Sequence, residues 1–317
     1  MPNTQSLNTQ FYTWKGYRCA YEVQNQKNLD SPTSVSQESR PQNSTEADPL
    51  VLIHPIGVGL ARQFWARFCQ GWQQQGQSQV LYLPDFLGCG ESDMPAVAYR
   101  SEDWAKQLLY FLTAVVKRPS VLVVQGALFP VAIALAQIPE AKQWIKGFVL
   151  SGPPAWAVMT TPTTSWQIRL LWNLLFEPPV GPLFYRYARR RAFLESFSVK
   201  QLFGDSQDVD TDWLDMLEQG AVNPASRYAV FSFLAGFWRQ DYAERLRKLE
   251  IPTLVTVGES ASSISRSGKT ETPQERVALY LQHLPQAQGK IIAGRNVMPY
   301  EATTAFIEAI APFCLEL

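Results

Sequence analysis

Residues 121–135 have the sequence Val121-Leu122-Val123-Val124-Gln125-Gly126-Ala127-Leu128-Phe129-Pro130-Val131-Ala132-Ile133-Ala134-Leu135, a nearly continuous apolar run that contains one glycine. Its valine-rich first part predicts a strand buried on both faces. Gly126 can adopt the positive φ of a tight turn. Pro130 suits the first turn of a helix, where its missing N–H is not needed. We therefore predict a buried strand that turns sharply into a helix.

Short apolar runs alternate with helical patterns on both sides of this unit. Strands are predicted in a hairpin over residues 11–23 around Lys15-Gly16, and over 49–53, 80–83, 121–125, 147–150, 253–257 and 290–293. Helices are predicted over 64–72, over 101–116 with Ser101 as its cap, over 274–284 and over 301–311. This alternation predicts an α/β fold, a doubly wound and mostly parallel eight-stranded sheet with right-handed crossovers.

A long helical segment interrupts the alternation. Residues 153–249 are rich in Trp, Phe and Leu at helical spacing and are predicted to form a lid inserted over the strand ends. Residues 1–152 and 250–317 then form the core. Within the core, residues 24–48 are polar and predict a mobile surface loop.

Composition excludes several classes of function. The chain has 317 residues and equal numbers of basic and acidic side chains, 28 of each, so no overall charge would attract nucleic acid. No apolar run reaches the ~20 residues of a transmembrane helix, and the N-terminus lacks the pattern of a signal peptide. We expect a protein in the cytoplasm or peripherally attached to a membrane. The scattered cysteines Cys19, Cys69, Cys89 and Cys314 predict packed, reduced thiols, and we expect no metal or cofactor.

Two motifs add to the order of elements. The turn Ile53-His54-Pro55-Ile56-Gly57 is similar to the H-G-x-G turn of the α/β-hydrolase superfamily, although Pro55 replaces a glycine. The segment Pro84-Asp85-Phe86-Leu87-Gly88-Cys89-Gly90-Glu91-Ser92-Asp93 is similar to its D-x-x-G-x-G-x-S-D loop. The chain therefore resembles this superfamily, in particular the lidded esterases, haloalkane dehalogenases and epoxide hydrolases. Residues 87–90 and 125–128 are also similar to cyanobacterial and plastid members that lack the catalytic triad.

The resemblance locates the three positions of a catalytic triad, which needs a nucleophile, a base and an acid. The nucleophile of the G-x-S-x-G turn aligns with Ala127, whose methyl group cannot attack a substrate. The acid aligns with Ala261 in Gly258-Glu259-Ser260-Ala261, and the base with Asn296 in the segment 294–301. A carboxamide is not basic near neutral pH. The superfamily fold thus predicts a hydrolase, whereas these positions predict an inactive one.

Other residues offer little to rebuild the triad. His54 belongs to the oxyanion turn and is expected to be structural, and His283 falls on the predicted helix 274–284. The polar residues Glu259, Ser260, Ser262 and Ser263 are expected to form an ordinary solvated loop. The backbone N–H groups of Ile56 and Leu128 would form a notch resembling an oxyanion hole.

The lid suggests two kinds of binding. The first is binding of an apolar ligand in a pocket under the lid, which would be lined by Ile56, Leu128, Phe129, Phe233 and Trp238. Alternatively, these side chains fill the space themselves and form a closed core. The stripe Ile168, Leu171, Trp172 and Leu175 is expected to pack on the sheet domain. Alternatively, Trp172 contacts an anionic membrane surface or an acidic protein partner together with a basic cluster. This cluster consists of Arg186, Arg189, Arg190 and Arg191.

Three functions follow from these observations. The first is a catalytically inactive protein that acts as a binding, scaffold or assembly factor. The second is a binder of a small apolar ligand in the former substrate pocket. The third is an active hydrolase with a non-standard site. Because a fold is weak evidence for activity, the geometry of the site has to distinguish them.

Overall fold

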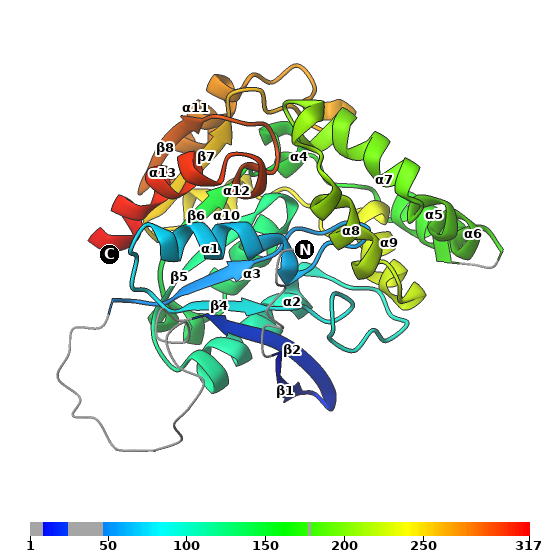
Figure 1. Cartoon of the computed structure of the whole chain (residues 1–317), viewed down its shortest axis with the longest axis horizontal. Helices are drawn as coiled ribbons and strands as arrows, with labels where there is room; N and C mark the ends of the chain where they lie inside the picture. The colour runs from blue at the N-terminus through cyan, green and yellow to red at the C-terminus, as the bar shows by residue number, and fades with distance from the viewer. Residues whose placement is uncertain (1–8, 25–46, 177–178) are drawn as a thin grey trace.

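The computed structural model describes residues 9–24, 47–176 and 179–317. One eight-stranded sheet runs through the molecule, with helices on both faces (Figure 1). The strands are β1 (Gln10–Trp14), β2 (Tyr17–Gln24), β3 (Leu50–Ile53), β4 (Leu81–Pro84), β5 (Ser120–Gln125), β6 (Ile145–Ser151), β7 (Thr253–Gly258) and β8 (Ala287–Ile292). Their order is β1-β2-β4-β3-β5-β6-β7-β8. Of the predicted mobile loop, residues 25–46 lie outside the described residues.

The direction of the strands confirms the predicted fold class. β2 pairs antiparallel with β1 and β4, and all other neighbouring strands pair in parallel. Lys15 and Gly16 both have positive φ and close the hairpin between β1 and β2, as predicted. The parallel strands place their carboxyl ends at one edge of the sheet, where the loops that follow them come together.

Side chains of the central strands alternate between two apolar clusters, one on each face of the sheet. Leu122 and Val124 of β5 belong to one cluster, and Val121 and Val123 belong to the other. Each such side chain contributes ~1.5–3 kcal/mol when it is fully removed from water. The central strands are therefore buried on both faces, which explains why they are continuous apolar runs.

The flanking helices complete these clusters. On one face lie α2 (Ser101–Phe111), α3 (Phe129–Ala136) and α11 (Pro273–His283), and on the other α1 (Ala66–Gln74), α12 (Met298–Glu301) and α13 (Thr303–Glu316). The aromatic stripe predicted over residues 64–72 is fully buried, with its first turn in a 3-10 helix. All four cysteines are free and buried, as predicted.

Two predicted helix ends are wrong. Ser101 is the first helical residue and is buried, so the cap position falls on Arg100, whose side chain makes no capping bond. The last helix does not stop before Pro312 but continues to Glu316. The buried side chains of Phe313 and Cys314 hold this end against the sheet, and their packing outweighs the hydrogen bond lost at the proline.

Seven α-helices lie between β6 and β7 in the described part of the chain, the region of the predicted lid. They are α4 (Trp156–Thr160), α5 (Ser165–Phe176), α6 (Val180–Ala188), α7 (Arg191–Phe197), α8 (Thr211–Gly220), α9 (Arg227–Ala235) and α10 (Ala243–Arg247). In Figure 1, α5, α6 and α9 lie together at the end of the molecule opposite the C-terminus. Within the described parts of the chain, no helix is both long and apolar enough to cross a membrane.

The prediction that the apolar stripe of α5 packs on the sheet domain is wrong. Ile168 and Trp172 are half-buried, but α5 packs mainly against α9 and α6, and Leu171 is exposed. The side chain of Leu175 lies outside the described residues. The insertion is thick enough to have an interior of its own, so this stripe contacts other inserted helices instead of the sheet.

Candidate functional site

The turn after β5 is relaxed where a nucleophile elbow would be strained. A short 3-10 helix, η4 (Gly126–Leu128), joins β5 to α3, and Gly126 takes the positive φ of +59°. In the described parts of the chain, only Lys15 and Lys117 among non-glycine residues have positive φ, so Ala127 does not. Ala127, the predicted position of the nucleophile, therefore has neither a reactive oxygen nor the left-handed backbone that would display one.

A hydrogen bond connects the last residue of β5 to the loop that follows β8. The Gln125 side chain donates from Nε2 to the backbone oxygen of Asn296 over 2.7 Å. Gly152, which follows the intervening strand β6, has a positive φ of +56°, and a Cβ there would lie 3.3 Å from the same oxygen. The glycine leaves room for Gln125 to reach across β6.

Both the side chain and the backbone of Asn296 make hydrogen bonds to other segments of the chain. Its Nδ2 donates to the carbonyl oxygens of Gln201, at 2.7 Å, and of Ser262, at 2.9 Å. Its backbone N–H donates to the carbonyl oxygen of Leu202 over 3.0 Å. A carboxamide has two N–H donors, so both are used within the protein. The predicted position of the base thus holds a side chain that connects neighbouring segments of the chain.

The loop after β8 has a second anchor in Glu301. Its carboxylate accepts hydrogen bonds from the backbone N–H groups of Gly204 (2.9 Å), Arg295 (2.6 Å) and Val297 (3.3 Å). Burial raises the pKa of Glu301 above its usual value, and the three amides oppose that rise. The carboxylate therefore fixes the backbone that carries Asn296.

The loop after β7 shows no displaced catalytic group. Ala261 is buried in the same apolar cluster as Phe129. The Ser262 hydroxyl accepts two bonds from the Arg295 guanidinium, at 2.6 and 3.1 Å, and the exposed Ser260 hydroxyl donates to a backbone oxygen over 2.9 Å. These contacts are those of a polar loop, although Ser151 Oγ and Gln125 Oε1 nearby are buried without a hydrogen-bond partner among the described residues.

Neither histidine lies in the position of a general base. His54 is fully buried, its Nδ1 lies 2.7 Å from the Pro55 oxygen, and its Nε2 accepts from the Phe86 N–H over 3.3 Å. Burial lowers the pKa of His54, which favours its neutral form. His283 lies at the end of α11, bonds the Leu279 oxygen through Nδ1 and stacks on the Trp156 ring at 4.1 Å. Both have structural partners.

The predicted pocket residues are largely packed. Phe129 is fully buried and contacts the Tyr280 ring at a centroid distance of 6.0 Å. Phe233 and Trp238 are half-buried and stack on each other at 5.2 Å. Ile56 packs against the apolar cluster that contains Leu128. β3 and β5 are adjacent and parallel, so the turns that carry the two predicted oxyanion donors lie at the same edge of the sheet.

The loop of residues 84–93 surrounds a buried ion cluster that sequence reasoning missed. Arg62 is buried and contacts the carboxylates of Glu22, Asp85 and Glu91. Asp85 also accepts from the backbone N–H groups of Arg62 and Glu91, at 2.9 and 3.0 Å. Gly90 has positive φ, and a Cβ there would overlap the Asp85 carboxylate. The available signal was an arginine three residues before Trp65, in helical register with the apolar stripe that begins at Phe64.

Fewer arginines of the basic cluster are available to a partner than the sequence predicts. Arg191 is paired with Asp215 and Glu218, at 2.6 and 2.5 Å, which raises its pKa. Arg189 is half-buried and donates to the Val222 oxygen over 3.1 Å. Arg186 and Arg190 are exposed. Two of the four guanidinium groups thus satisfy the protein's own acceptors, because α8 and the turn after it pack against this segment.

The helices α5 and α6 expose large apolar side chains instead. We call the following residues the α5–α6 surface: Trp166 (65% exposed), Leu170 (58%), Leu174 (52%), Val180 (44%), Leu183 (60%) and Tyr187 (53%). The three on α5 recur every fourth residue and so share one side of that helix. Trp172 is not among them, because it is half-buried with its ring 4.9 Å from that of Phe237. The spacing is visible in the sequence, but an apolar stripe on a helix is ordinarily expected to face the core and not the solvent.

Comparisons with known proteins agree with the fold. Among solved structures, the chain is similar to a thermophilic esterase from Thermogutta terrifontis, with TM-score 0.66 and 18% identity over 96% of this chain and 97% of that one. It is similar to the enol-lactonase from Burkholderia xenovorans LB400, with TM-score 0.67 and 14% identity over 96% and 99%. A variant of the haloalkane dehalogenase DatA from Agrobacterium tumefaciens C58 has TM-score 0.66 and 12% identity over 96% of each chain.

At these identities the structural likeness shows the fold alone. No curated protein matches the chain in sequence. The profile of the alpha/beta hydrolase family matches residues 50–309, which include β3 to β8 and the inserted helices. The chain therefore belongs to the alpha/beta hydrolase family.

Proposed function

We propose that this protein is a catalytically inactive member of its family that acts by binding. One observation carries the proposal: the amide of Asn296, at the position of the base, donates both of its protons to carbonyl oxygens of neighbouring loops. Hydrolysis of a substrate by a serine nucleophile requires a base that can take a proton from that serine. An amide committed to two structural bonds does not meet that requirement.

The other two triad positions support the same proposal. Ala127 lacks a nucleophilic atom and the positive φ of an elbow, and Ala261 is buried among apolar side chains. A single lost group can be replaced by a neighbour, but with three unreactive side chains these positions themselves offer neither a nucleophile nor a base.

The two alternatives have less support. An active hydrolase with a non-standard site needs a nucleophile beside a base, and both histidines bond to backbone groups. A small apolar ligand in the former pocket needs space beside Phe129, which is fully buried against other side chains.

The α5–α6 surface is the region that we propose for binding. Soluble chains seldom expose several large apolar side chains on one pair of packed helices without a partner for them. Trp and Leu beside the exposed guanidinium groups of Arg186 and Arg190 suit an anionic membrane surface, where apolar side chains insert between headgroups. An acidic protein partner is the alternative that the same surface would accept.

Turnover measurements test the loss of catalysis. The purified protein is incubated with a panel of short-chain p-nitrophenyl esters, beside a heat-denatured sample and the Ala127→Ser variant. We expect the native protein and the variant to match the denatured sample, because a serine at position 127 would still lack a base and an acid. Turnover by the native protein above that background would overturn the proposal.

A further inference from the structure

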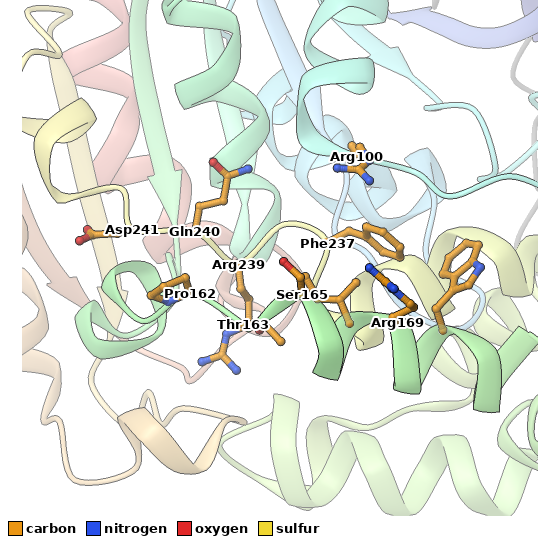
Figure 2. Close-up of a pocket in the computed structure, with 11 residues that line it drawn as sticks. Arg100, Pro162, Thr163, Ser165, Arg169, Phe237, Arg239, Gln240 and Asp241 are labelled. Carbon is orange, nitrogen blue, oxygen red and sulfur yellow. The ribbon is translucent and has the colours of Figure 1, made fainter.

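A cavity of about 550 Å³ opens between the start of α5, the segment after α9 and the residue that precedes α2 (Figure 2). The side chains that matter here are Arg100, Arg169, Arg239, Trp172 and Phe237. The cavity has none of the three triad positions in its lining, so it is separate from the site described above. Its volume falls in the range of about 300–1,000 Å³ that is typical of small-molecule sites.

The cavity has an excess of positive charge. Arg100, Arg169 and Arg239 line it, and in the described part of the chain none of them pairs with a carboxylate. Asp241 is the one acidic residue of the lining, and Figure 2 shows its carboxylate pointing away from Arg100 and Arg169. Arg239 donates to the Ser267 hydroxyl over 3.2 Å, but its buried Nε has no described partner. Its desolvation lowers its pKa, as expected for a cation short of acceptors.

The start of α5 adds to this charge. Ser165, its first residue, lines the cavity, and the preceding Thr164 hydroxyl donates to Gln167 Oε1 over 2.8 Å. A helix begins with unpaired N–H groups and a partial positive charge. The arginines and this helix end therefore both attract an anion into the cavity.

The rest of the lining is apolar and aromatic. The Trp172 and Phe237 rings meet edge to face at 4.9 Å, and Ile168 lies one helical turn before Trp172. The Arg100 guanidinium lies 5.1 Å from the centre of the Phe237 ring. A bare inorganic anion would leave these rings and most of the volume unused.

We propose that this cavity binds an amphiphilic organic anion, a phosphate or carboxylate group attached to an apolar body. The anionic group contacts Arg100 and Arg169, whose planar forks match either oxyanion. The apolar body packs on Trp172, Phe237 and Ile168. The inference goes beyond the proposed function and stands whether or not the chain has lost catalysis.

Calorimetric titration of the full-length protein with hexyl phosphate tests the proposal. We expect saturable binding that weakens at least about tenfold in Arg100→Gln and in Arg169→Gln, since a charge-assisted bond contributes about 1.5–3 kcal/mol. Arg169→Lys should lie between, because it keeps the charge and loses the fork. Arg18→Gln, on strand β2 and outside the lining of the cavity, is the matched control and should bind as the native protein does. Melting curves show that each variant is folded.

Three further ligands decide the chemistry of the occupant. Inorganic phosphate should bind at least about tenfold more weakly than hexyl phosphate, and hexanol should not saturate the site. Soluble dihexanoyl phosphatidate distinguishes the sources: tighter binding than that of hexyl phosphate assigns a lipid, and weaker binding assigns a free phosphate ester. Absence of saturable hexyl phosphate binding, equal binding of inorganic phosphate, or equal affinities of the native protein and Arg169→Gln would each overturn the proposal.

Discussion

Asn296 connects its own loop to three other segments of the chain at the carboxyl edge of the sheet. Its amide joins the carbonyl oxygens of Gln201 and Ser262, and its own backbone oxygen accepts from Gln125. An imidazole has only one N–H in its neutral form and cannot make both side-chain bonds. The residue therefore stabilises the fold at a place where a catalytic residue usually costs stability.

Replacing Asn296 by alanine should lower the free energy of unfolding by about 1–3 kcal/mol, because two carbonyl oxygens lose their donor. Urea denaturation at pH 7 measures the change. Asn173→Ala is the control, since that side chain is exposed on α5 and makes none of the hydrogen bonds described. Equal stabilities of the two variants would show that the bonds of Asn296 contribute little.

Asn296→Asp should be less stable than Asn296→Ala at pH 7, because it would place a carboxylate against two carbonyl oxygens. That environment favours the protonated acid, so the pKa of the new carboxyl is higher in the folded than in the unfolded chain. The penalty is then present at neutral pH and shrinks as the pH falls through the raised folded pKa. Urea denaturation of both variants from pH 7 to pH 4 measures this, and a pH-independent difference would contradict it.

At the scale of elements, the loop of residues 84–93 depends on one buried cation. Arg62 contacts three carboxylates, and two of them, on Glu22 and Asp85, are also buried. Burial raises the pKa of Glu22 above its usual value, against the effect of Arg62. Carboxylates left without their cation in this interior would be costly.

Arg62→Ala should therefore lower the free energy of unfolding by about 3–5 kcal/mol. Arg67→Ala is the matched control on α1, where a more exposed guanidinium pairs with Asp210, and it should cost about 1 kcal/mol. Denaturant titration of the two variants side by side measures both losses. Similar losses would mean that the buried cluster has no special part in holding this loop.

The helices α5 and α6 should carry binding to membranes. Replacing Trp166, Leu170 and Leu174 together by serine should reduce cosedimentation with phosphatidylserine vesicles at least about tenfold, because the inserted apolar area is lost. The control replaces Ile264 and Leu315 by serine, since both are exposed apolar residues elsewhere. Binding that is equal in the two variants would exclude this surface, and binding by an acidic protein instead would identify the alternative partner.

Strands were easier to predict from the sequence than helix contacts. The valine-rich run of β5 has one stable environment, a sheet buried on both faces, so its place followed from composition. The three positions aligned with a catalytic triad came from the family resemblance and stay a prediction; the structure connects two of the segments that carry them to the loop of Asn296 by hydrogen bonds. The partner of α5 did not follow, because a stripe such as Ile168 and Trp172 specifies burial without specifying what buries it.

Tertiary packing also decided features that have no local signal. Pro312 marks a helix end in most sequences, but buried neighbours carry α13 beyond it. The guanidinium groups of Arg189 and Arg191 are clustered in sequence, yet elements that are distant in the chain supply their acceptors. Long-range contacts of this kind are invisible in a single sequence.

At the scale of the whole molecule, the chain has the eight-stranded sheet with flanking helices of the α/β-hydrolase fold, and we propose that it differs from active members in the groups at the strand ends. The sheet is buried by two apolar clusters that do not depend on a catalytic residue. Loops at its carboxyl edge are therefore free to exchange reactive side chains for hydrogen bonds between loops. On this account the inserted helices, with their exposed surface and their basic cavity, carry the function.

Intact-mass measurement after treatment with a fluorophosphonate tests the loss of catalysis most directly, because that reagent reacts with any activated serine, whatever its place in the fold. Native protein and protein denatured before treatment are measured at equal reagent concentration. We predict that both stay at the mass of the unmodified chain. One adduct per chain on native protein, absent from the denatured sample, would contradict the account.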